Sequence, residues 1–421
     1  MYCDLNMLVI NVLRLILKVE WHEGCYIADV NEGRKPQMDL RGACAVGGRP
    51  GVLRVSPDGS QLLVFDQDRA RMSIVGVAAW RLLEQVDLAP SPASSPFYLA
   101  GFEDSIFLGG LPGKVGIFSA ASRRHSGAIP CVGDVCDLAI LPESRQAILA
   151  TASGREGFID LAGLSPVRTL ARMDLPLPPV RGSLALLARH GLGALVLRDA
   201  DHRDEAIALF ECRPGTEPCF LRMEGGVRSL AFDSEGRYLY AACHDDSMLA
   251  VIDVREQRIV DRVLLAGEPL AVINDPVGRR IWAVCEKLGH VAFVDPRDHS
   301  VFRRTPVTGV AADPDLVAFS PEGRLAVVPE LDGSLSLLEG GMPGSEYGEV
   351  DDRLEMGREL GRVVWSPLGE EIYVASPRSG EVLRLAVERG DQEIKDTDLY
   401  LMDQLLRQDE PAGRKNPLFP P

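Results

Sequence analysis

Short runs of apolar residues, separated by turn residues, recur along most of the chain. The clearest copy spans residues 226–272, where four such runs follow one another before the pattern begins again. Runs of four to eight residues that are rich in β-branched side chains and bounded by Gly, Pro, Asp or Ser are typical of β-strands. The pattern therefore predicts an all-β fold built from repeated units of four strands.

One recurring turn sets the register of these units. Its copies read SPDG at Ser56–Gly59, DSEG at Asp233–Gly236, DPVG at Asp275–Gly278, SPEG at Ser320–Gly323 and SPLG at Ser366–Gly369. Pro presets φ, Asp or Ser bonds to the local backbone, and Gly accepts a positive φ, so each copy predicts a hairpin turn. Weaker copies fall at Phe102–Asp104, Pro142–Arg145 and His190–Gly193.

The repeat count predicts the architecture. A unit of about 42–49 residues forms one thin sheet, which buries its two apolar faces only when further sheets stack against it. Eight units between Gly51 and Gly390 predict an eight-bladed β-propeller with four-stranded blades, and seven blades remain an alternative. We expect residues 1–394 to form the propeller, with the repeats in 50–394, and residues 395–421 to form a tail.

The N-terminal segment supplies the strand that the last unit lacks. Strand-like runs occur at Leu13–Trp21, Gly24–Val30 and Pro36–Leu40, before the first full repeat. The chain turns polar after Glu381–Val387, so the last unit has no outer strand of its own. We therefore expect residues 1–49 to provide closing strands that complete the last blade and remove an exposed sheet edge.

The C-terminal tail has a different pattern. Residues 396–408 predict a short helix with one apolar face, and a Pro-rich, extended segment follows. Either the helix packs on the propeller, or the tail docks into another protein. The candidate partner-binding residues of the tail are Leu399, Met402, Leu405, Leu406, Pro417, Leu418 and Phe419.

Four sequence elements resemble a known repeat family. Asp233–Gly236, Tyr238–Ala242, Val251–Asp253 and Gly267–Val272 are similar to the YVTN/lactonase-like propeller repeat, in which an SPDG-type turn leads into LYVA, then VID, then G-x-P-x-x-V. No WD dipeptide follows a GH, so the repeat differs from WD40. The resemblance implies a propeller fold but no single activity, because its members include surface-layer proteins, lactonases, periplasmic binders and haem d1 domains.

Charge and cysteine content narrow the classes of partner and compartment. The formal net charge is −16, which repels phosphate backbones and anionic membranes, so we expect no nucleic-acid partner. The apolar run Met7–Leu17 is too short to span a bilayer and has no basic segment before it, so no membrane insertion or export is expected. Nine cysteines without framework spacing predict free thiols and a cytoplasmic location.

Candidate chemistry should lie in the loops that enter the innermost strands, at the mouth of the central channel. The channel-mouth candidates are Asp134, Arg228, Glu268, Asp313, Asp315 and Arg362. The seven histidines show no ligand spacing, so no metal and no cofactor is expected. The acidic stretches at 199–204 and 244–246 are interpreted as solvated loops, because they lack the Gly and the distal Glu of a calcium loop.

The sequence favours a non-catalytic scaffold that recruits protein partners through its faces and its tail. Blade signals are intact, whereas no nucleophile elbow, phosphate-binding loop or dinucleotide fingerprint occurs. Two alternatives from other classes stay open. One is a lactonase-like hydrolase with an acidic site at the channel, and the other is a haem d1-type cofactor binder, which would need clustered Arg or Lys and an axial His.

Overall fold

The computed structural model describes residues 20–22, 25–27 and 35–388, apart from gaps at 57, 67, 69–70, 88–97, 103–104, 112, 120–121, 123, 165–166, 202–203, 276, 278, 287–288, 309–316 and 341–346. The chain divides into two compact units, Met1–Gln37 with Glu388–Pro421, and Met38–Val387. In the first unit the described residues form one two-stranded sheet of β1 (Glu20–His22) and β2 (Cys25–Ile27).

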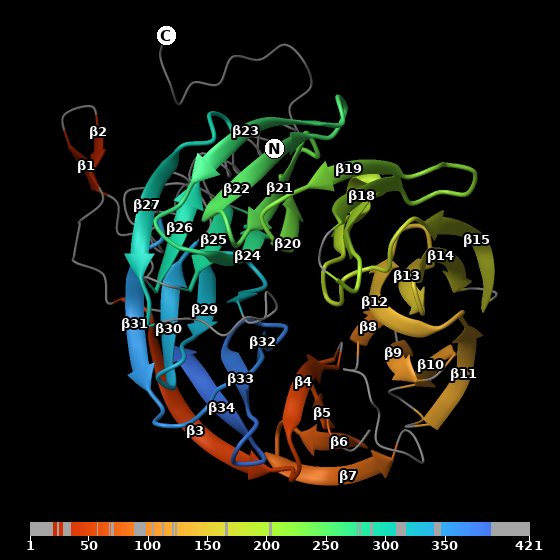
Figure 1. Ribbon diagram of the computed structural model, residues 1–421. Helices are drawn as coiled ribbons and strands as arrows, with labels where there is room; N and C mark the ends of the chain where they lie inside the picture. Colours follow the sequence, from red (N-terminus) through yellow and green to blue (C-terminus); the bar gives the residue numbers. More distant parts are fainter. Residues whose placement is uncertain are drawn as a thin grey trace, which may run out of the picture. The chain divides into compact units, whose positions relative to one another are not determined.

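The described residues of the second unit form eight antiparallel four-stranded sheets, numbered I to VIII here (Figure 1). Sheet I holds β4 (Pro50–Val55), β5 (Gln61–Asp66), β6 (Arg71–Gly76) and β7 (Arg81–Asp87). Sheet II holds β8 (Tyr98–Phe102), β9 (Ser105–Leu111), β10 (Lys114–Ser119) and β11 (Arg124–Pro130). Sheet III holds β12 (Asp134–Leu141), β13 (Gln146–Ser153), β14 (Glu156–Leu164) and β15 (Val167–Leu175). Sheet IV holds β16 (Ala185–Leu187), β17 (Leu192–Arg198), β18 (Glu205–Glu211) and β19 (Cys219–Met223), with one 3₁₀ turn, η1 (Ala188–His190).

The remaining sheets repeat the same order. Sheet V holds β20 (Val227–Phe232), β21 (Tyr238–Cys243), β22 (Met248–Asp253) and β23 (Arg258–Leu264). Sheet VI holds β24 (Pro269–Asn274), β25 (Ile281–Cys285), β26 (His290–Val294) and β27 (Val301–Pro306). Sheet VII holds β28 (Ala318–Phe319), β29 (Leu325–Pro329), β30 (Ser334–Glu339) and β31 (Val350–Glu355). Sheet VIII holds β32 (Val363–Trp365), β33 (Glu371–Ser376), β34 (Glu381–Glu388) and β3 (Gln37–Ala45).

The predicted hairpin turns are present where the structure describes them. Gly59, Gly236, Gly323 and Gly369 have φ between 69° and 72°, which is the left-handed region that favours glycine. The first turn residue also has a structural role: Asp233 Oδ1 accepts the amide of Tyr238 at 2.9 Å. In three other copies the first turn residue is a serine, whose hydroxyl oxygen accepts the equivalent amide. Ser56, Ser320 and Ser366 accept the amides of Gln61, Leu325 and Glu371, respectively. The turn sequence thus fixes where the second strand begins.

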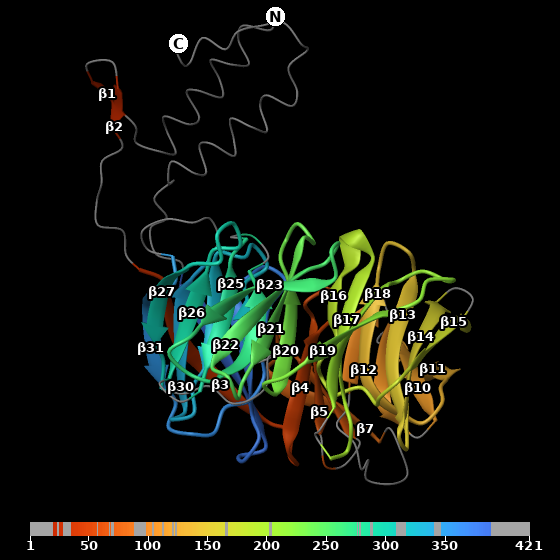
Figure 2. The ribbon, with the colours of Figure 1, turned by 45° about the horizontal axis from the view of Figure 1, so that its top comes forward.

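Burial distinguishes the middle strands from the outer ones. All five residues of β25 and all five of β26 are buried, whereas β7 is exposed along almost its whole length. A middle strand carries Val, Ile, Leu and Ala on both faces because each face packs on a neighbouring sheet. In Figure 2 the strands of neighbouring sheets in this unit run side by side.

Eight hydrophobic clusters join the eight sheets. Each cluster takes buried residues from two sheets that follow one another, from I–II through VII–VIII. The eighth cluster joins sheet VIII to sheet I, with Tyr373 and Val382 packed against Leu62 and Val64. No sheet of the described unit therefore keeps an apolar face without a neighbour.

The N-terminal segment contributes one described strand to sheet VIII. β3 is the outer strand of sheet VIII, beside β34, as expected for N-terminal residues that complete the last unit. Its bounds, Gln37–Ala45, extend further than the predicted Pro36–Leu40. The earlier runs contribute β1 and β2, which pair with each other instead, so residues 1–36 do not serve as closing strands in the described part of the chain.

Candidate functional site

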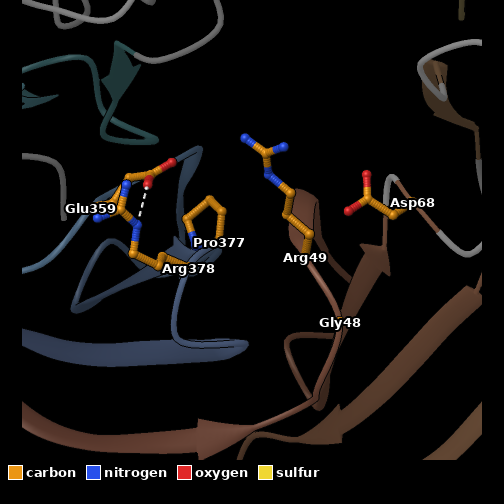
Figure 3. Close-up of a pocket in the computed structure, with 6 residues that line it drawn as sticks. All are labelled: Gly48, Arg49, Asp68, Glu359, Pro377 and Arg378. Atoms are coloured by element: carbon orange, nitrogen blue, oxygen red, sulfur yellow. Dashed lines mark ion pairs between the residues drawn. The ribbon is translucent and has the colours of Figure 1, made fainter.

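A cavity of about 530 Å³ lies between sheets VIII and I. Its lining comes from four loops of these two sheets (Figure 3), and consists of Gly48, Arg49, Asp68, Glu359, Pro377 and Arg378. Two of these loops enter a first strand, namely the segment before β4 and the segment before β32. The other two loops join a second strand to a third strand, after β5 and after β33.

Backbone contacts hold the two sides of the cavity together. The amides of Val46 and Gly47 donate to the carbonyl of Gly380, at 3.0 and 2.9 Å, which ties the segment before β4 to the turn after β33. Gly48 has a φ of 65°, and a Cβ placed on it would lie 1.7 Å from Oδ2 of Asp66. Glycine at position 48 therefore lets the buried Asp66 carboxylate approach the backbone beside Arg49.

The charges of the cavity are unevenly paired. Glu359 forms an ion pair with Arg378, in which Oε2 lies 3.3 Å from Nε. Arg49 stands between Pro377 and Asp68 in Figure 3, and no ion pair or hydrogen bond to a described residue involves its guanidinium. The site can therefore offer one uncommitted guanidinium group, which is suited to a carboxylate or phosphate.

Three loops that correspond to three of these four form a second cluster between sheets V and VI. His244 follows β21, Glu268 precedes β24, and Glu286 follows β25. His244 Nε2 lies 3.7 Å from Oε2 of Glu268 and 3.7 Å from Oε2 of Glu286, and Nδ1 lies 3.0 Å from Oδ1 of Asp245. The exposed fractions of the His244, Glu268 and Glu286 side chains are 17%, 25% and 50%.

The other predicted channel-mouth residues are dispersed. Asp134 begins β12 and lies 4.0 Å from Arg181, and Arg228 is exposed on β20. Arg362 precedes β32, where its carbonyl accepts the amide of Ala375 at 3.0 Å. Of the channel-mouth candidates that the structure describes, only Glu268 belongs to a cluster, the one with His244 and Glu286. Two of the predicted residues, Asp313 and Asp315, lie outside the described residues, as do the tail candidates Leu399, Met402, Leu405, Leu406, Pro417, Leu418 and Phe419.

Two cysteines of the middle strands are thiols of low reactivity. Cys243 and Cys285 are fully buried free cysteines. Burial raises the pKa of the Cys243 thiol to about 11 and that of Cys285 to about 12. Because the thiolate is the nucleophile, a raised pKa keeps these two thiols protonated near neutral pH and makes them unsuited to covalent catalysis.

Sequence reasoning missed Arg49 and Arg378, and it assigned residues 244–246 to a solvated loop. Neither cluster carries a motif, because its residues come from separate loops: His244 and Glu286 lie 42 positions apart in the chain, and Arg49 and Arg378 lie 329 positions apart. The available signal was the repeat register, in which residues just after a second strand meet residues just before the next sheet's first strand. His244 and Glu268 follow this rule, and so do Arg378 and Arg49.

Comparisons with known proteins show the fold. No protein-family model matches the chain, and no curated protein matches it. The hydrazine synthase structure of Kuenenia stuttgartiensis is similar with a TM-score of 0.52 and 13% identity, over 88% of this chain and 99% of that one. The Cps50 (Swd1) β-propeller domain of Myceliophteria thermophila is similar with a TM-score of 0.48 and 12% identity, over 83% of this chain and 100% of that one.

Among the described residues no helix is long and apolar enough to cross a membrane. The described residues form eight antiparallel four-stranded sheets that are joined by clusters between successive sheets, and together with the similarity to the hydrazine synthase structure they identify the fold as a β-propeller.

Proposed function

We propose that this chain is a non-catalytic scaffold, a closed eight-bladed propeller that binds protein partners. Support for closure comes from the eight clusters, one of which joins the last sheet to the first, and from β3 in the last sheet. A ring of mutually packed sheets presents its loops rigidly, which limits the ordering cost when a partner binds. The repeats belong, in this proposal, with the YVTN/lactonase-like propellers that their sequence resembles.

The observation that carries the proposal is the uncommitted guanidinium of Arg49 in the cavity between sheets VIII and I. Guanidinium groups bind carboxylates through paired, charge-assisted hydrogen bonds. Arg378, the other cation of the cavity, is already paired with Glu359, so Arg49 carries the proposed contact. The partner we propose is a protein with an acidic, extended segment that places a Glu or Asp side chain against Arg49.

The lining of the cavity favours a peptide over a small-molecule cofactor. Cavities for small molecules are lined mainly by hydrophobic and aromatic side chains. Four of the six lining residues here are charged, and Pro377 is the one apolar side chain among them. A haem-type group would need apolar faces and an axial His, and the described lining offers neither.

Direct binding tests the proposal. The full chain is titrated against a fluorescent Glu-rich peptide and against the same peptide with Gln at every Glu, and anisotropy is measured. We expect saturable binding of the Glu peptide only, weakened at least tenfold by Arg49→Glu and unchanged by Arg189→Glu on the exposed η1 turn. Equal binding of both peptides, or an equal loss in both variants, would show that the cavity is not the docking site.

The tail provides a second proposed contact, independent of the cavity. The apolar positions of its predicted helix and its Pro-flanked Leu418 and Phe419 fit short-segment docking, in which Pro lowers the ordering cost. Co-purification from the native host compares the full chain with a chain that ends at Gly390. Loss of a partner from the shorter chain is the expected result, and recovery of identical proteins by both chains would refute a docking role for the tail.

A further inference from the structure

We propose that His244, Glu268 and Glu286 form a binding site for one divalent transition-metal ion, with Zn²⁺ as the best match, between sheets V and VI. The site goes beyond the scaffold function, and neither proposal depends on the other. One imidazole nitrogen and two carboxylate oxygens form a donor set that suits zinc and related ions.

The distances between the donor atoms fit a single ion. One ligand atom from each of the three residues lies within 4.8 Å of the others, and His244 Nε2 is 3.7 Å from each carboxylate oxygen. Zinc binds nitrogen and oxygen at about 2.0–2.2 Å, so two ligand atoms on one tetrahedral ion are roughly 3.4 Å apart. Small rotamer adjustments would bring the three atoms to that spacing.

The proton arrangement of His244 presents a lone pair to the site. Nδ1 lies 3.0 Å from a carboxylate oxygen of Asp245, which accepts hydrogen bonds, so Nδ1 carries the proton of the neutral ring. Nε2 then directs its lone pair toward Glu268 and Glu286. A carboxylate that holds the second nitrogen of a metal-binding histidine is a common supporting contact in zinc sites, where it orients the ring and raises its basicity.

The backbone fixes the three loops that carry the ligands. The amide of Glu286 donates to the carbonyl of Glu268 at 3.0 Å, which joins the two carboxylate-bearing loops. The amide of His244 donates to the carbonyl of Gly226 at 3.2 Å. Gly226 has a φ of 64°, and a Cβ there would lie 2.5 Å from Asp245 Oδ2, so glycine makes room for the residue that orients the imidazole.

The side chain that lies beside the two carboxylates is a histidine, whose Nε2 supplies a nitrogen ligand atom. Within the described part of the chain, this is the one group of three such side chains with metal-ligand spacing.

Metal binding by the full chain tests the proposal. The protein is treated with a chelator, desalted and titrated with Zn²⁺ by calorimetry, and the stoichiometry is checked by native mass spectrometry. We expect one ion per chain, and loss of that ion in His244→Ala and in Glu286→Gln. His190→Ala, which removes an exposed histidine far from the cluster in sequence, should bind as the unchanged protein does. Thermal melting confirms that each variant is folded.

Cobalt distinguishes this site from adventitious binding by the nine cysteines. Co²⁺ held by nitrogen and oxygen gives weak visible bands, whereas thiolate ligation adds an intense near-ultraviolet band. We expect the weak bands alone, and we expect Asp245→Asn to weaken Zn²⁺ binding about 10- to 100-fold, as the loss of an orienting carboxylate does. No stoichiometric ion, a thiolate band, or an ion retained by both His244→Ala and Glu286→Gln would overturn the proposal.

Discussion

The indole nitrogen of Trp282 donates a hydrogen bond to the hydroxyl of Tyr347, 2.6 Å away. The Tyr347 hydroxyl in turn donates to Oδ2 of Asp275 at 2.6 Å. All three side chains are buried, and the contact joins sheet VI to the segment that leads into β31 of sheet VII. Burial, together with the Asp275 carboxylate, raises the pKa of the Tyr347 phenol above its ordinary value, so the hydroxyl keeps its proton.

Tyr347→Phe should destabilise the protein by about 1–3 kcal/mol, because it removes a hydrogen-bond partner from two buried groups at once. The measurement is the free energy of unfolding in urea. Tyr238→Phe is the matched control, since Tyr238 is only half-buried and its ring packs edge-on against His299. A loss in Tyr347→Phe no larger than that in Tyr238→Phe would show that the buried chain of hydrogen bonds contributes no stability.

Removal of β3 should unfold sheet VIII or cause association through its exposed edge. β3 places Met38 in the cluster between sheets VII and VIII and Cys44 in the cluster between sheets VIII and I. A chain that starts at residue 35 keeps both contacts, whereas one that starts at residue 46 loses both and leaves the outer edge of β34 without a partner strand. Size-exclusion chromatography and thermal melting should show a folded first variant and an aggregated or less stable second one; equal behaviour would contradict the closing role of β3.

Most of the fold could be predicted from the sequence, because blade construction depends on local chemistry. The SPDG-type turn fixes a hairpin within four residues, and the short apolar run Tyr238–Ala242 indicates a strand without reference to distant residues. The N-terminal segment was predicted less well, since pairing is a long-range choice. Gly24–Val30 and Pro36–Leu40 were both predicted as strands, but β2 pairs with β1 whereas β3 pairs with β34.

The candidate site was less predictable than the fold. Glu268 was predicted as a channel-mouth residue, but its neighbours His244 and Glu286 were not, because they come from the turns of two different sheets. Arg49 carries no motif and gains its significance from Gly380 and Pro377, which lie more than 300 positions away. Such sites depend on which loops the packed sheets bring together, and a single sequence does not display that juxtaposition.

Gly48→Ala should destabilise the loop beside Arg49 more than Gly47→Ala does. Both glycines have a positive φ, so each substitution costs about 1–2 kcal/mol from backbone strain. A Cβ on Gly47 would meet nothing within 4 Å, whereas one on Gly48 would overlap Asp66 and displace the carboxylate that accepts the amide of Asp68. Urea unfolding measures the difference, and anisotropy with the Glu-rich peptide should show weaker binding for Gly48→Ala alone. Equal effects of the two substitutions would mean that Asp66 does not position this loop.

His290 should make the protein less stable in mild acid. Its side chain is buried at the start of β26, Nε2 has no hydrogen-bond partner among the described residues, and burial with the nearby Arg304 charge lowers its pKa below 6.5. Below pH 6.5 the unfolded imidazole takes up a proton that the folded one resists, so the free energy of unfolding falls as the pH drops, by at most about 1.4 kcal/mol per pH unit.

This pH-dependent loss of stability is absent above pH 6.5, where the ring is neutral in both the folded and the unfolded state. His290→Met should therefore remove the loss, and Met is the residue at the equivalent position, the start of β22. Urea unfolding of both proteins between pH 5 and pH 8 measures the difference between their stabilities. That difference should shift in favour of the variant as the pH falls below 6.5, because only the native chain must then bury a group that water would protonate; a difference independent of pH would show that His290 is protonated equally well in the folded state.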